Sequence, residues 1–274
     1  MSRTIAAALL AAVLLIGASS PTRAADCEVV PHTLDEVQHA VHAGSALREA
    51  LDATAAEVAF VGRIGSDQSK RGILYTHAGL AWRDHPEGRW HFIHLLNHCG
   101  SDASELFDDG PVDFFLERPF RYEALVVVPT PELRRALVRR LREGASRRLH
   151  EPRYSAIAHP LKTRFQNSNQ WLLELVAVAL EPEAPLTRDA AQRILRRWQF
   201  EPERVRLGFF ERVGTHRMGN VSLKDHSRGE LRRGGFVYVS VKSLRRFLED
   251  NGLAEQVFEL PCEPCRQTSL TTTR

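Results

Sequence analysis

The stretch N-S-N-Q-W-L-L-E-L-V-A-V-A-L, residues 167–180, is the most apolar helical segment of the sequence beyond the N-terminal leader. A helix that is apolar on nearly all sides is stable only inside a protein, so we expect this one at the centre of the fold. Its first residues, Asn167, Ser168, Asn169 and Gln170, are polar. They form a polar entry into the buried helix, and the rest of the chain is expected to pack around it.

Upstream of this helix, the sequence predicts another helix and a set of strands. Thr33 and Glu36 form a capping box, and apolar residues from Leu34 to Leu51 follow with helical spacing. The residues D-H-P-E-G at 84–88 are a hairpin signal between two strand-like segments. The predicted strands are 57–62, 73–82, 89–96 and 122–128, with a polar loop at 63–72.

Helices predominate after the strands. Thr130 and Pro131 supply an N-cap and a first-turn proline for a helix over 132–143, and Thr187 caps another helix. Weaker patterns indicate a strand at 236–241 and a short helix at 243–250. The order of one helix, several strands and then helices predicts an α+β fold, with a mixed or antiparallel sheet packed against the central helix at 167–180.

Residues 1–24 have the features of a secretory signal peptide. Arg3 supplies a positive charge, an apolar run extends from Ile5 to Gly17, and Thr22-Arg23-Ala24 provides small residues for cleavage. The apolar run is shorter than the ~20 residues of a membrane span, and a retained N-terminal anchor is the alternative. We expect a periplasmic or secreted protein with no stable membrane span after cleavage.

Three parts are expected along the chain. Residues 1–24 form the signal peptide, and residues 25–182 form the α+β core. Residues 183–274 form a C-terminal elaboration of helices and strands that ends in a tail with a C-x-x-C motif.

The composition is that of a globular protein, because 43% hydrophobic and 26% charged residues exclude both a disordered tail and a multi-span membrane protein. Without Arg3 and Arg23, 35 Lys and Arg residues stand against 34 Asp and Glu residues. This balance predicts no nucleic-acid binding. The arginines within 134–142 alternate with leucines at helical spacing, so we interpret them as a solvated helix face; lipid or polyanion binding is the alternative.

The sequence contains four cysteines, Cys27, Cys99, Cys262 and Cys265. An even number in an exported protein favours disulfide bonds. Cys262 and Cys265 form a C-x-x-C in a proline-containing tail and not at the start of a helix, which favours a structural disulfide over a redox centre. Cys27 and Cys99 pair either with each other or with the tail.

Two motifs carry the chemistry. The residues T-H-A-G at 76–79 place a histidine on a predicted strand before small residues, and N-S-N-Q-W at 167–171 begins the buried helix. Together they resemble the circularly permuted papain-like superfamily, which includes NlpC-type and lecithin retinol acyltransferase-like hydrolases. That resemblance implies a permuted papain-like fold with His77 as the base, His94 on the next strand as its orienting partner, and a nucleophile at the helix start.

A closer resemblance is to a bacterial secreted family known as domain of unknown function 2145. It covers about Val58 to Ala179 and implies no reaction of its own. The segments that carry it are R-I-G-S-D-Q-S at 63–69, T-H-A-G at 76–79, H-L-L-N-H-C-G at 94–100 and Q-N-S-N-Q-W at 166–171.

Ser168 stands where the permuted enzymes carry cysteine. A nucleophile at a helix N-terminus lies beside unpaired backbone N–H groups that can stabilise an oxyanion, and a nearby histidine can accept its proton. Serine is a weaker nucleophile than cysteine, so three interpretations stay open. Ser168 is a nucleophile activated by His77, or Ser168 or Asn167 merely caps the helix of a ligand-binding fold, or Cys99 is the nucleophile.

The expected binding residues surround these positions. Asp67 and Ser69 either orient His77 or cap a turn, and no cofactor is expected. No metal is expected either, because histidines 91, 94 and 98 do not share one face of a strand. The full set of expected binding residues is Asp67, Ser69, Asn167, Asn169 and Gln170.

Two functions are consistent with these features. The first is an exported hydrolase of amide or acyl bonds in a component of the cell envelope, such as a peptide, peptidoglycan or an acyl compound. The alternative is a catalytically inactive envelope protein that binds a ligand on the same fold.

Overall fold

The computed structural model describes residues 30–215 and 218–265. The predicted signal peptide at 1–24 and Cys27 lie outside the described residues.

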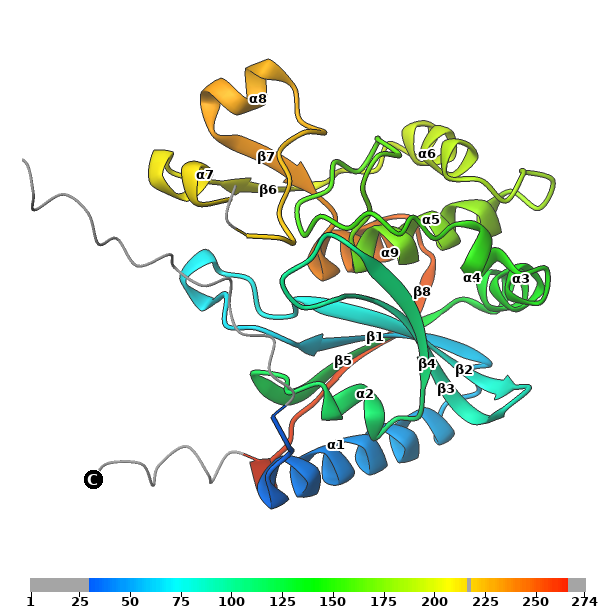
Figure 1. The fold of residues 1–274 in the computed structure, drawn as a ribbon. Coiled ribbons are helices and arrows are strands. Elements are labelled where there is room, and N and C mark those ends of the chain that lie inside the picture. Colours follow the sequence, from blue (N-terminus) through cyan, green and yellow to red (C-terminus); the bar gives the residue numbers. More distant parts are fainter. Residues whose placement is uncertain (1–29, 216–217, 266–274) are drawn as a thin grey trace, which may run out of the picture.

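A six-stranded antiparallel sheet forms the centre of the molecule (Figure 1). Its strand order is β4-β3-β2-β1-β5-β8, which confirms the predicted α+β class with an antiparallel sheet. A separate two-stranded ribbon is formed by β6 and β7. The strands are β1 (Val58–Ile64), β2 (His77–His85), β3 (Gly88–Asn97), β4 (Ser104–Asp109), β5 (Arg121–Pro129), β6 (Glu203–Arg206), β7 (Gly235–Tyr238) and β8 (Ala254–Leu260).

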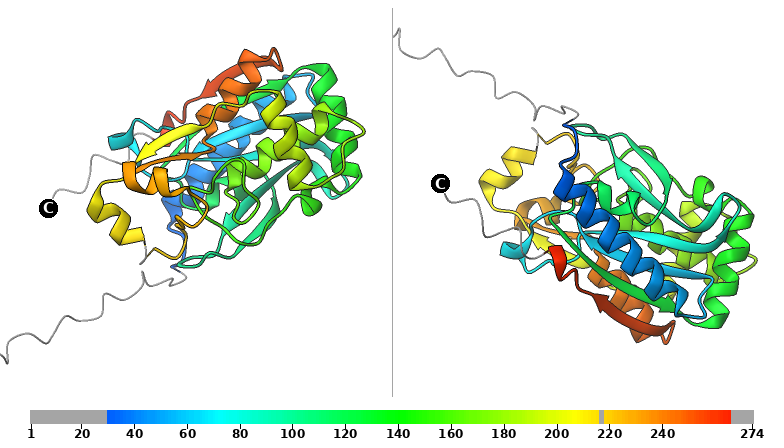
Figure 2. Two further views of the ribbon diagram at one scale, coloured as in Figure 1. Left: turned by 90° about the horizontal axis from the view of Figure 1, so that it is seen from above. Right: turned by 90° about the horizontal axis from the view of Figure 1, so that it is seen from below.

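Helices cover both faces of the sheet (Figures 1 and 2). One face packs against α1 (Leu34–Asp52) and α2 (Asp113–Leu116). The other face packs against α3 (Pro131–Arg142), α4 (Ala145–Arg148), α5 (Ser168–Leu180), α6 (Arg188–Arg197) and α9 (Val241–Asp250). The remaining helices are η1 (Ser69–Arg71), α7 (Phe209–Thr215) and α8 (Arg228–Arg233).

Strand β1 shows why consecutive residues must be apolar in the middle of this sheet. Val58 and Phe60 face the layer that contains α5, whereas Ala59 and Val61 face α1. All seven residues of β1 are buried. A short uninterrupted apolar run of this kind is typical of a strand that is covered on both faces.

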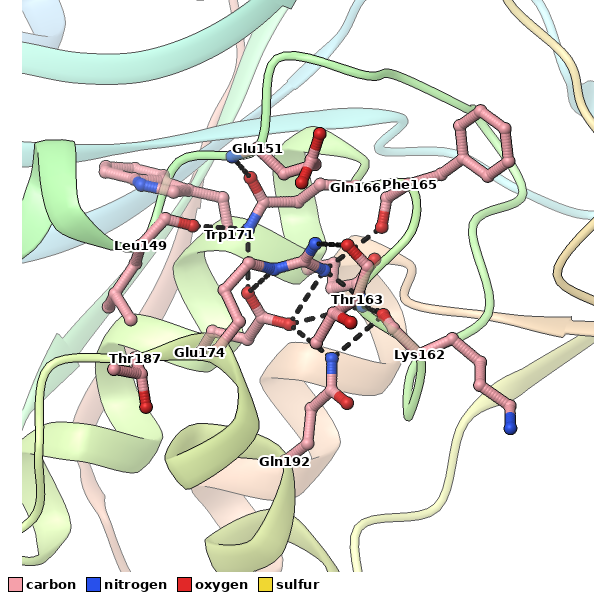
Figure 3. A network of polar contacts seen from close by, with 12 residues as sticks. Leu149, Glu151, Lys162, Thr163, Phe165, Gln166, Trp171, Glu174, Thr187 and Gln192 are labelled. Carbon is pink, nitrogen blue, oxygen red and sulfur yellow. Dashed lines mark hydrogen bonds and ion pairs between the residues drawn. The ribbon is translucent and has the colours of Figure 1, made fainter.

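Helix α5 is the buried central helix that the sequence predicts, and a buried carboxylate anchors it (Figure 3). Glu174 on α5 receives hydrogen bonds from Nε and Nη2 of Arg188 at 2.8 and 3.0 Å. Gln166 and Gln192 donate to the same carboxylate at 2.7 and 3.1 Å. Arg188 also donates to the carbonyl oxygens of Thr163 and Phe165. This network ties the loop before α5 to α5 and α6, and it therefore fixes where α5 begins.

Several helices and strands of the structure differ from those that the sequence predicts. β1 extends to Ile64, inside the segment expected to be a loop, and β2 begins at His77 and not at residue 73. Strands β4, β6 and β8 and helix α2 are additions to the predicted set. β8, in the C-terminal part of the chain, pairs with β5 and forms one edge of the main sheet.

The arginines of α3 are not all on a solvated face, which corrects the prediction. Arg134 and Arg140 are buried. Nη1 of Arg134 donates to Glu255 on β8 at 2.6 Å, and Arg140 donates to three backbone carbonyls at the end of α5 and just beyond it. Both guanidinium groups hold neighbouring elements together and are therefore not available for a lipid or polyanion.

The C-terminal cysteines form the expected disulfide, Cys262–Cys265. Cys99 is disulfide-bonded as well, so its sulfur is not a free thiol. Within residues 30–215 and 218–265, no helix combines the length and the apolar character that crossing a membrane requires.

Candidate functional site

Ser168 is the first residue of α5, and the helix is capped by its neighbour Asn167. The Asn167 backbone is extended, and its Oδ1 accepts the N–H of Gln170 at 2.7 Å. The hydroxyl of Ser168 is therefore not used as the cap. The N–H groups of Ser168 and Asn169 make no hydrogen bond to the described part of the chain. Two backbone donors thus remain beside the hydroxyl at the positive end of the helix dipole.

His77 and Ser168 meet at this helix start. Nδ1 of His77 lies 3.2 Å from Oγ of Ser168, within hydrogen-bonding distance. Both side chains are buried, with relative exposures of 9% for His77 and 4% for Ser168. The structure therefore joins the predicted base to the predicted nucleophile.

The hydrogen bonds continue from His77 to a carboxylate. Nε2 of His77 lies 3.0 Å from Nδ1 of His94, and Nε2 of His94 lies 3.0 Å from Oδ2 of Asp109. An ionised carboxylate can only accept, so His94 donates from Nε2 and accepts at Nδ1, and His77 donates from Nε2. This order leaves the lone pair of His77 Nδ1 directed at the Ser168 hydroxyl, as a general base requires.

The surroundings of His77 keep its ring neutral. Burial, together with the positive charge of Arg63 and the nearby ring of His94, holds the pKa of His77 well below its ordinary value of 6.5. Arg63 faces His77 across the β1–β2 pair and is itself bound to Glu117 at 2.8 Å and to the carbonyl oxygen of Phe114. At neutral pH, the His77 ring is therefore unprotonated, and its Nδ1 lone pair is available to the Ser168 hydroxyl.

Gly79 explains the glycine of the T-H-A-G motif. A Cβ atom at this position would lie 3.1 Å from Cβ of His94, 3.2 Å from the ring of Phe114 and 3.3 Å from the carbonyl oxygen of Ile93. The Phe114 ring packs edge-on against His94, with centroids 5.2 Å apart. A side chain is disfavoured here because Cβ of His94, the Phe114 ring and the Ile93 carbonyl oxygen already lie close above the strand.

Asp67 and Ser69 do not orient His77. Oδ1 of Asp67 accepts the N–H of Ser69 at 3.0 Å, and this bond together with the Ser69 hydroxyl lowers the pKa of the Asp67 carboxyl. The pair caps an exposed turn and lines a separate pocket of about 350 Å³. Its role is that of a turn, which is one of the two interpretations open from the sequence.

Asn169 and Gln170 also have mainly structural contacts. Nδ2 of Asn169 lies 3.4 Å from the carbonyl oxygen of Thr76, next to His77. Nε2 of Gln170 donates to the carbonyl oxygens of His159 and Pro160. Both side chains hold loops against the start of α5. The amide oxygen of Asn169 is buried without a hydrogen-bond partner among the described residues.

Asp109 is the site residue that the sequence analysis missed. It is the last residue of β4, whose sequence S-E-L-F-D-D lacks the strict alternation of a half-buried strand. The signal that could have found it is the carboxylate pair at 108 and 109. Neighbouring strand residues face opposite sides, so one of the two must share a face with His94.

The three histidines at 91, 94 and 98 have separate partners. His91 pairs with Asp108 and His98 with Glu105, while His94 belongs to the site. His85, His91 and Asp108 place three potential ligand atoms within 4.8 Å of one another. However, Nδ1 of His85 accepts the N–H of Glu87 at 3.2 Å, which assigns the ring proton to Nε2, the atom that faces Asp108. This geometry favours two imidazoles donating to one carboxylate over a metal site.

Comparison with known proteins adds the family. A family model described as "Uncharacterized protein conserved in bacteria (DUF2145)" matches residues 50–248, which include Ser168, His77, His94 and Asp109. No curated protein and no solved structure matches the chain. Since the matched segment spans well over half of the 274 residues, the chain belongs to the DUF2145 family of bacterial proteins.

Proposed function

We propose that this protein is an exported hydrolase that cleaves amide or acyl bonds in a component of the cell envelope. Ser168 is the nucleophile, His77 is the general base, and His94 orients His77. The observation that carries the proposal is the unbroken series of contacts from Ser168 Oγ through both histidines to Asp109.

The reaction follows from these contacts. Oγ of Ser168 attacks the carbonyl carbon of the substrate while Nδ1 of His77 takes the hydroxyl proton. The carbonyl oxygen becomes an oxyanion, which the free N–H groups of Ser168 and Asn169 stabilise. His77 then gives the proton to the leaving amine or alcohol, and an acyl ester of Ser168 remains. Water, deprotonated by His77, hydrolyses that ester and regenerates the hydroxyl.

The positive charge that His77 gains in this step needs compensation, because the ring is buried and faces Arg63. Asp109 supplies it through His94, because the carboxylate accepts the Nε2–H of His94 while Nδ1 of His94 accepts the hydrogen bond from His77. A carboxylate that acts through an imidazole in this way stabilises the imidazolium and fixes its tautomer.

The arrangement of a strand histidine, a partner on the next strand and a helix-start nucleophile is the one implied by the resemblance to permuted papain-like hydrolases. Serine in place of cysteine makes the base more important here, because a hydroxyl has almost no anionic form at neutral pH whereas a thiol has a few per cent. The carboxylate at the end of the series fits that requirement. Export follows from the predicted signal peptide, and the envelope substrate follows from export.

One observation favours a second function, ligand binding without catalysis. Ser168 and His77 are 4% and 9% exposed, and neither lines the pockets that contain Tyr75, Asp67 or Cys262. At this exposure, surrounding side chains would have to move before a substrate could reach the hydroxyl. A binding protein on the same fold needs no such opening.

A fluorophosphonate probe distinguishes the two functions, since it forms a covalent bond with an activated serine. We expect the purified protein to be labelled at Ser168, with the site assigned by peptide mass spectrometry. Labelling should be lost in Ser168→Ala and strongly reduced in His77→Gln. An unlabelled protein that also fails to hydrolyse acyl esters and peptidoglycan fragments would reject the hydrolase and leave the binding function.

A further inference from the structure

A second site lies on the other side of the segment that leads into β2. An open cavity of about 460 Å³ is lined by the Arg71–Tyr75 segment, the β6–β7 ribbon, the N-terminus of α9 and the adjoining β5–β8 edge of the sheet. In Figure 1 the cyan loop before β2 lies below the yellow and orange β6–β7 ribbon. Neither Ser168 nor His77 lines this cavity, so it is separate from the proposed hydrolase site.

The N-terminus of α9 opens into this cavity. Ser240 caps the helix through the N–H of Ser243, and Ser240, Val241 and Lys242 all line the cavity. The N–H groups of Val241 and Lys242 make no hydrogen bond to the described residues. Free N–H groups at the positive end of a ten-residue helix favour an anion.

A buried hydroxyl is a second, independent feature of this cavity. Tyr238 lines the same cavity and is 9% exposed, and its hydroxyl oxygen is closed to solvent without a hydrogen-bond partner among the described residues. An unpaired buried hydroxyl is costly, so a ligand that accepts a hydrogen bond from it gains from the contact. Burial and the nearby charge of Glu203 raise the pKa of Tyr238 to about 12, so the hydroxyl stays protonated and can donate.

Cations complete the lining. Lys242 and Arg245 lie one turn apart on α9, and Arg204 and Arg206 lie on β6. Lys242 lies 3.7 Å from a carboxylate oxygen of Glu203, and Arg245 lies 3.1 Å from one of Glu249. Both carboxylates are partly exposed, so a ligand can replace them as partners. The side chains of Arg204 and Arg206 make no hydrogen bond or ion pair within the residues that the structure describes. The lining contains two carboxylates, those of Glu203 and Glu259, against five cationic side chains, the fifth being Arg71.

We propose that this cavity binds a phosphate monoester, with its phosphate group at the N-terminus of α9. The donors are two backbone N–H groups, the Tyr238 hydroxyl and the Lys242 and Arg245 side chains. These donors are more numerous than the hydrogen bonds that the two oxygens of a carboxylate can accept. A phosphate monoester offers three terminal oxygens and close to two negative charges. The organic part of the ligand would contact an apolar wall of the cavity, which is formed by Leu74, Leu125 and Val241. The proposal does not depend on the reactivity of Ser168.

Isothermal titration calorimetry with phenyl phosphate tests the site in the whole protein. We expect saturable binding, at least tenfold weaker in Lys242→Gln/Arg245→Gln and about three- to tenfold weaker in Tyr238→Phe. The Tyr238 variant loses only an unpaired hydroxyl, so its melting temperature should not fall. The control Arg139→Gln/Arg142→Gln removes the same charge from exposed positions of α3 and should bind like the wild type.

Three results would overturn the proposal: absence of binding at millimolar phenyl phosphate, equal weakening by the α3 control, or equally tight binding of benzoate. Vesicles that contain phosphatidic acid, compared with phosphatidylcholine vesicles, identify the source of the phosphate. Binding to phosphatidic acid that Lys242→Gln/Arg245→Gln abolishes assigns a lipid headgroup, and binding of phenyl phosphate alone assigns a soluble phosphate ester.

Discussion

The hydroxyl oxygen of Ser168 lies 3.2 Å from Nδ1 of His77, although the two residues are 91 positions apart in the chain. The contact exists because Asn167 takes the capping role at the start of α5 and leaves the serine hydroxyl facing β2. The proposed hydrolase function depends on what this hydroxyl can do.

Replacement of Ser168 by cysteine should convert the site to a thiol nucleophile. The thiol would lie at the same helix N-terminus, where the dipole lowers a thiol pKa. We expect Ser168→Cys to retain hydrolysis and to lose it after treatment with iodoacetamide, while the wild type is insensitive to this reagent. Turnover of a chromogenic acyl ester measures both. Equal turnover by Ser168→Ala would show that the hydroxyl takes no part.

Asp109 and Asp108 provide a matched pair of carboxylates on opposite faces of β4. Asp109 receives the hydrogen bond from His94, whereas Asp108 contacts His85 and His91. Asp109→Asn can donate to His94 and reverse the tautomers of both histidines in the site, so we expect a loss of kcat of about 10²–10⁴-fold. Asp108→Asn should leave kcat within about twofold of the wild type in the same assay. Equal losses would mean that the carboxylates act only through the stability of the hairpin.

Gly79 should tolerate no side chain without disturbing His94. Alanine at this position meets Cβ of His94 at 3.1 Å and the ring of Phe114 at 3.2 Å, so the imidazole must shift by a few tenths of an ångström. We expect Gly79→Ala to fold and to lose about tenfold or more in kcat, because small misplacements of a base are costly. Gly235→Ala is the control, since nothing lies within 4 Å of its added Cβ. Wild-type kcat in Gly79→Ala would contradict this packing argument.

The pKa of His77 predicts how stability depends on pH. Because burial holds this pKa well below 6.5 in the folded protein, the unfolded chain binds the extra proton first as pH falls. The contribution of His77 is complete above about pH 6.5 and is lost as pH falls toward the folded pKa, by up to about 1.4 kcal/mol per pH unit.

Urea denaturation of the wild type and His77→Gln between pH 7.5 and 5 measures this contribution. The difference in unfolding free energy should change with pH below 6.5, and the same comparison with His42→Gln is the control at an exposed position. A difference that is constant across this range would place His77 in a solvated environment. Hydrolysis by the wild type should likewise persist at pH 6 and decline only at more acidic pH.

The centre of the fold could be predicted from the sequence because its signals are local and strong. The apolar run of α5, the capping box at Thr33 and the hairpin signal at 84–88 each specify an element without reference to the rest of the chain. Strands β4 and β8 are edge strands of mixed polarity. Their position is decided by hydrogen bonding to β3 and β5, which no local pattern reveals.

The site residues likewise include some that the sequence predicts and some that it does not. His77, His94 and Ser168 follow from motifs, and the structure brings these three together. Whether Asn167 or Ser168 caps the helix could not be predicted, because both residue types are good caps and only the extended backbone of Asn167 decides it. Asp109 could not be assigned either, since its role depends on the pairing of β4 with β3.

The Glu174–Arg188 network predicts a large asymmetry between removing one partner and removing both. Arg188→Met leaves a fully buried carboxylate without its cation, which should cost about 3–5 kcal/mol of unfolding free energy. In Glu174→Gln/Arg188→Met no buried charge remains, so we expect the double variant to be more stable than Arg188→Met alone. Urea denaturation measures both, and Arg135→Gln, which removes an exposed pair with Glu132, controls for the loss of an arginine.

Because the same network fixes the loop that precedes Ser168, the double variant should also hydrolyse more slowly than the wild type even where it is fully folded. A double variant less stable than Arg188→Met would show that the guanidinium contacts with the loop carbonyls, and not the buried charge pair, hold α5 in place.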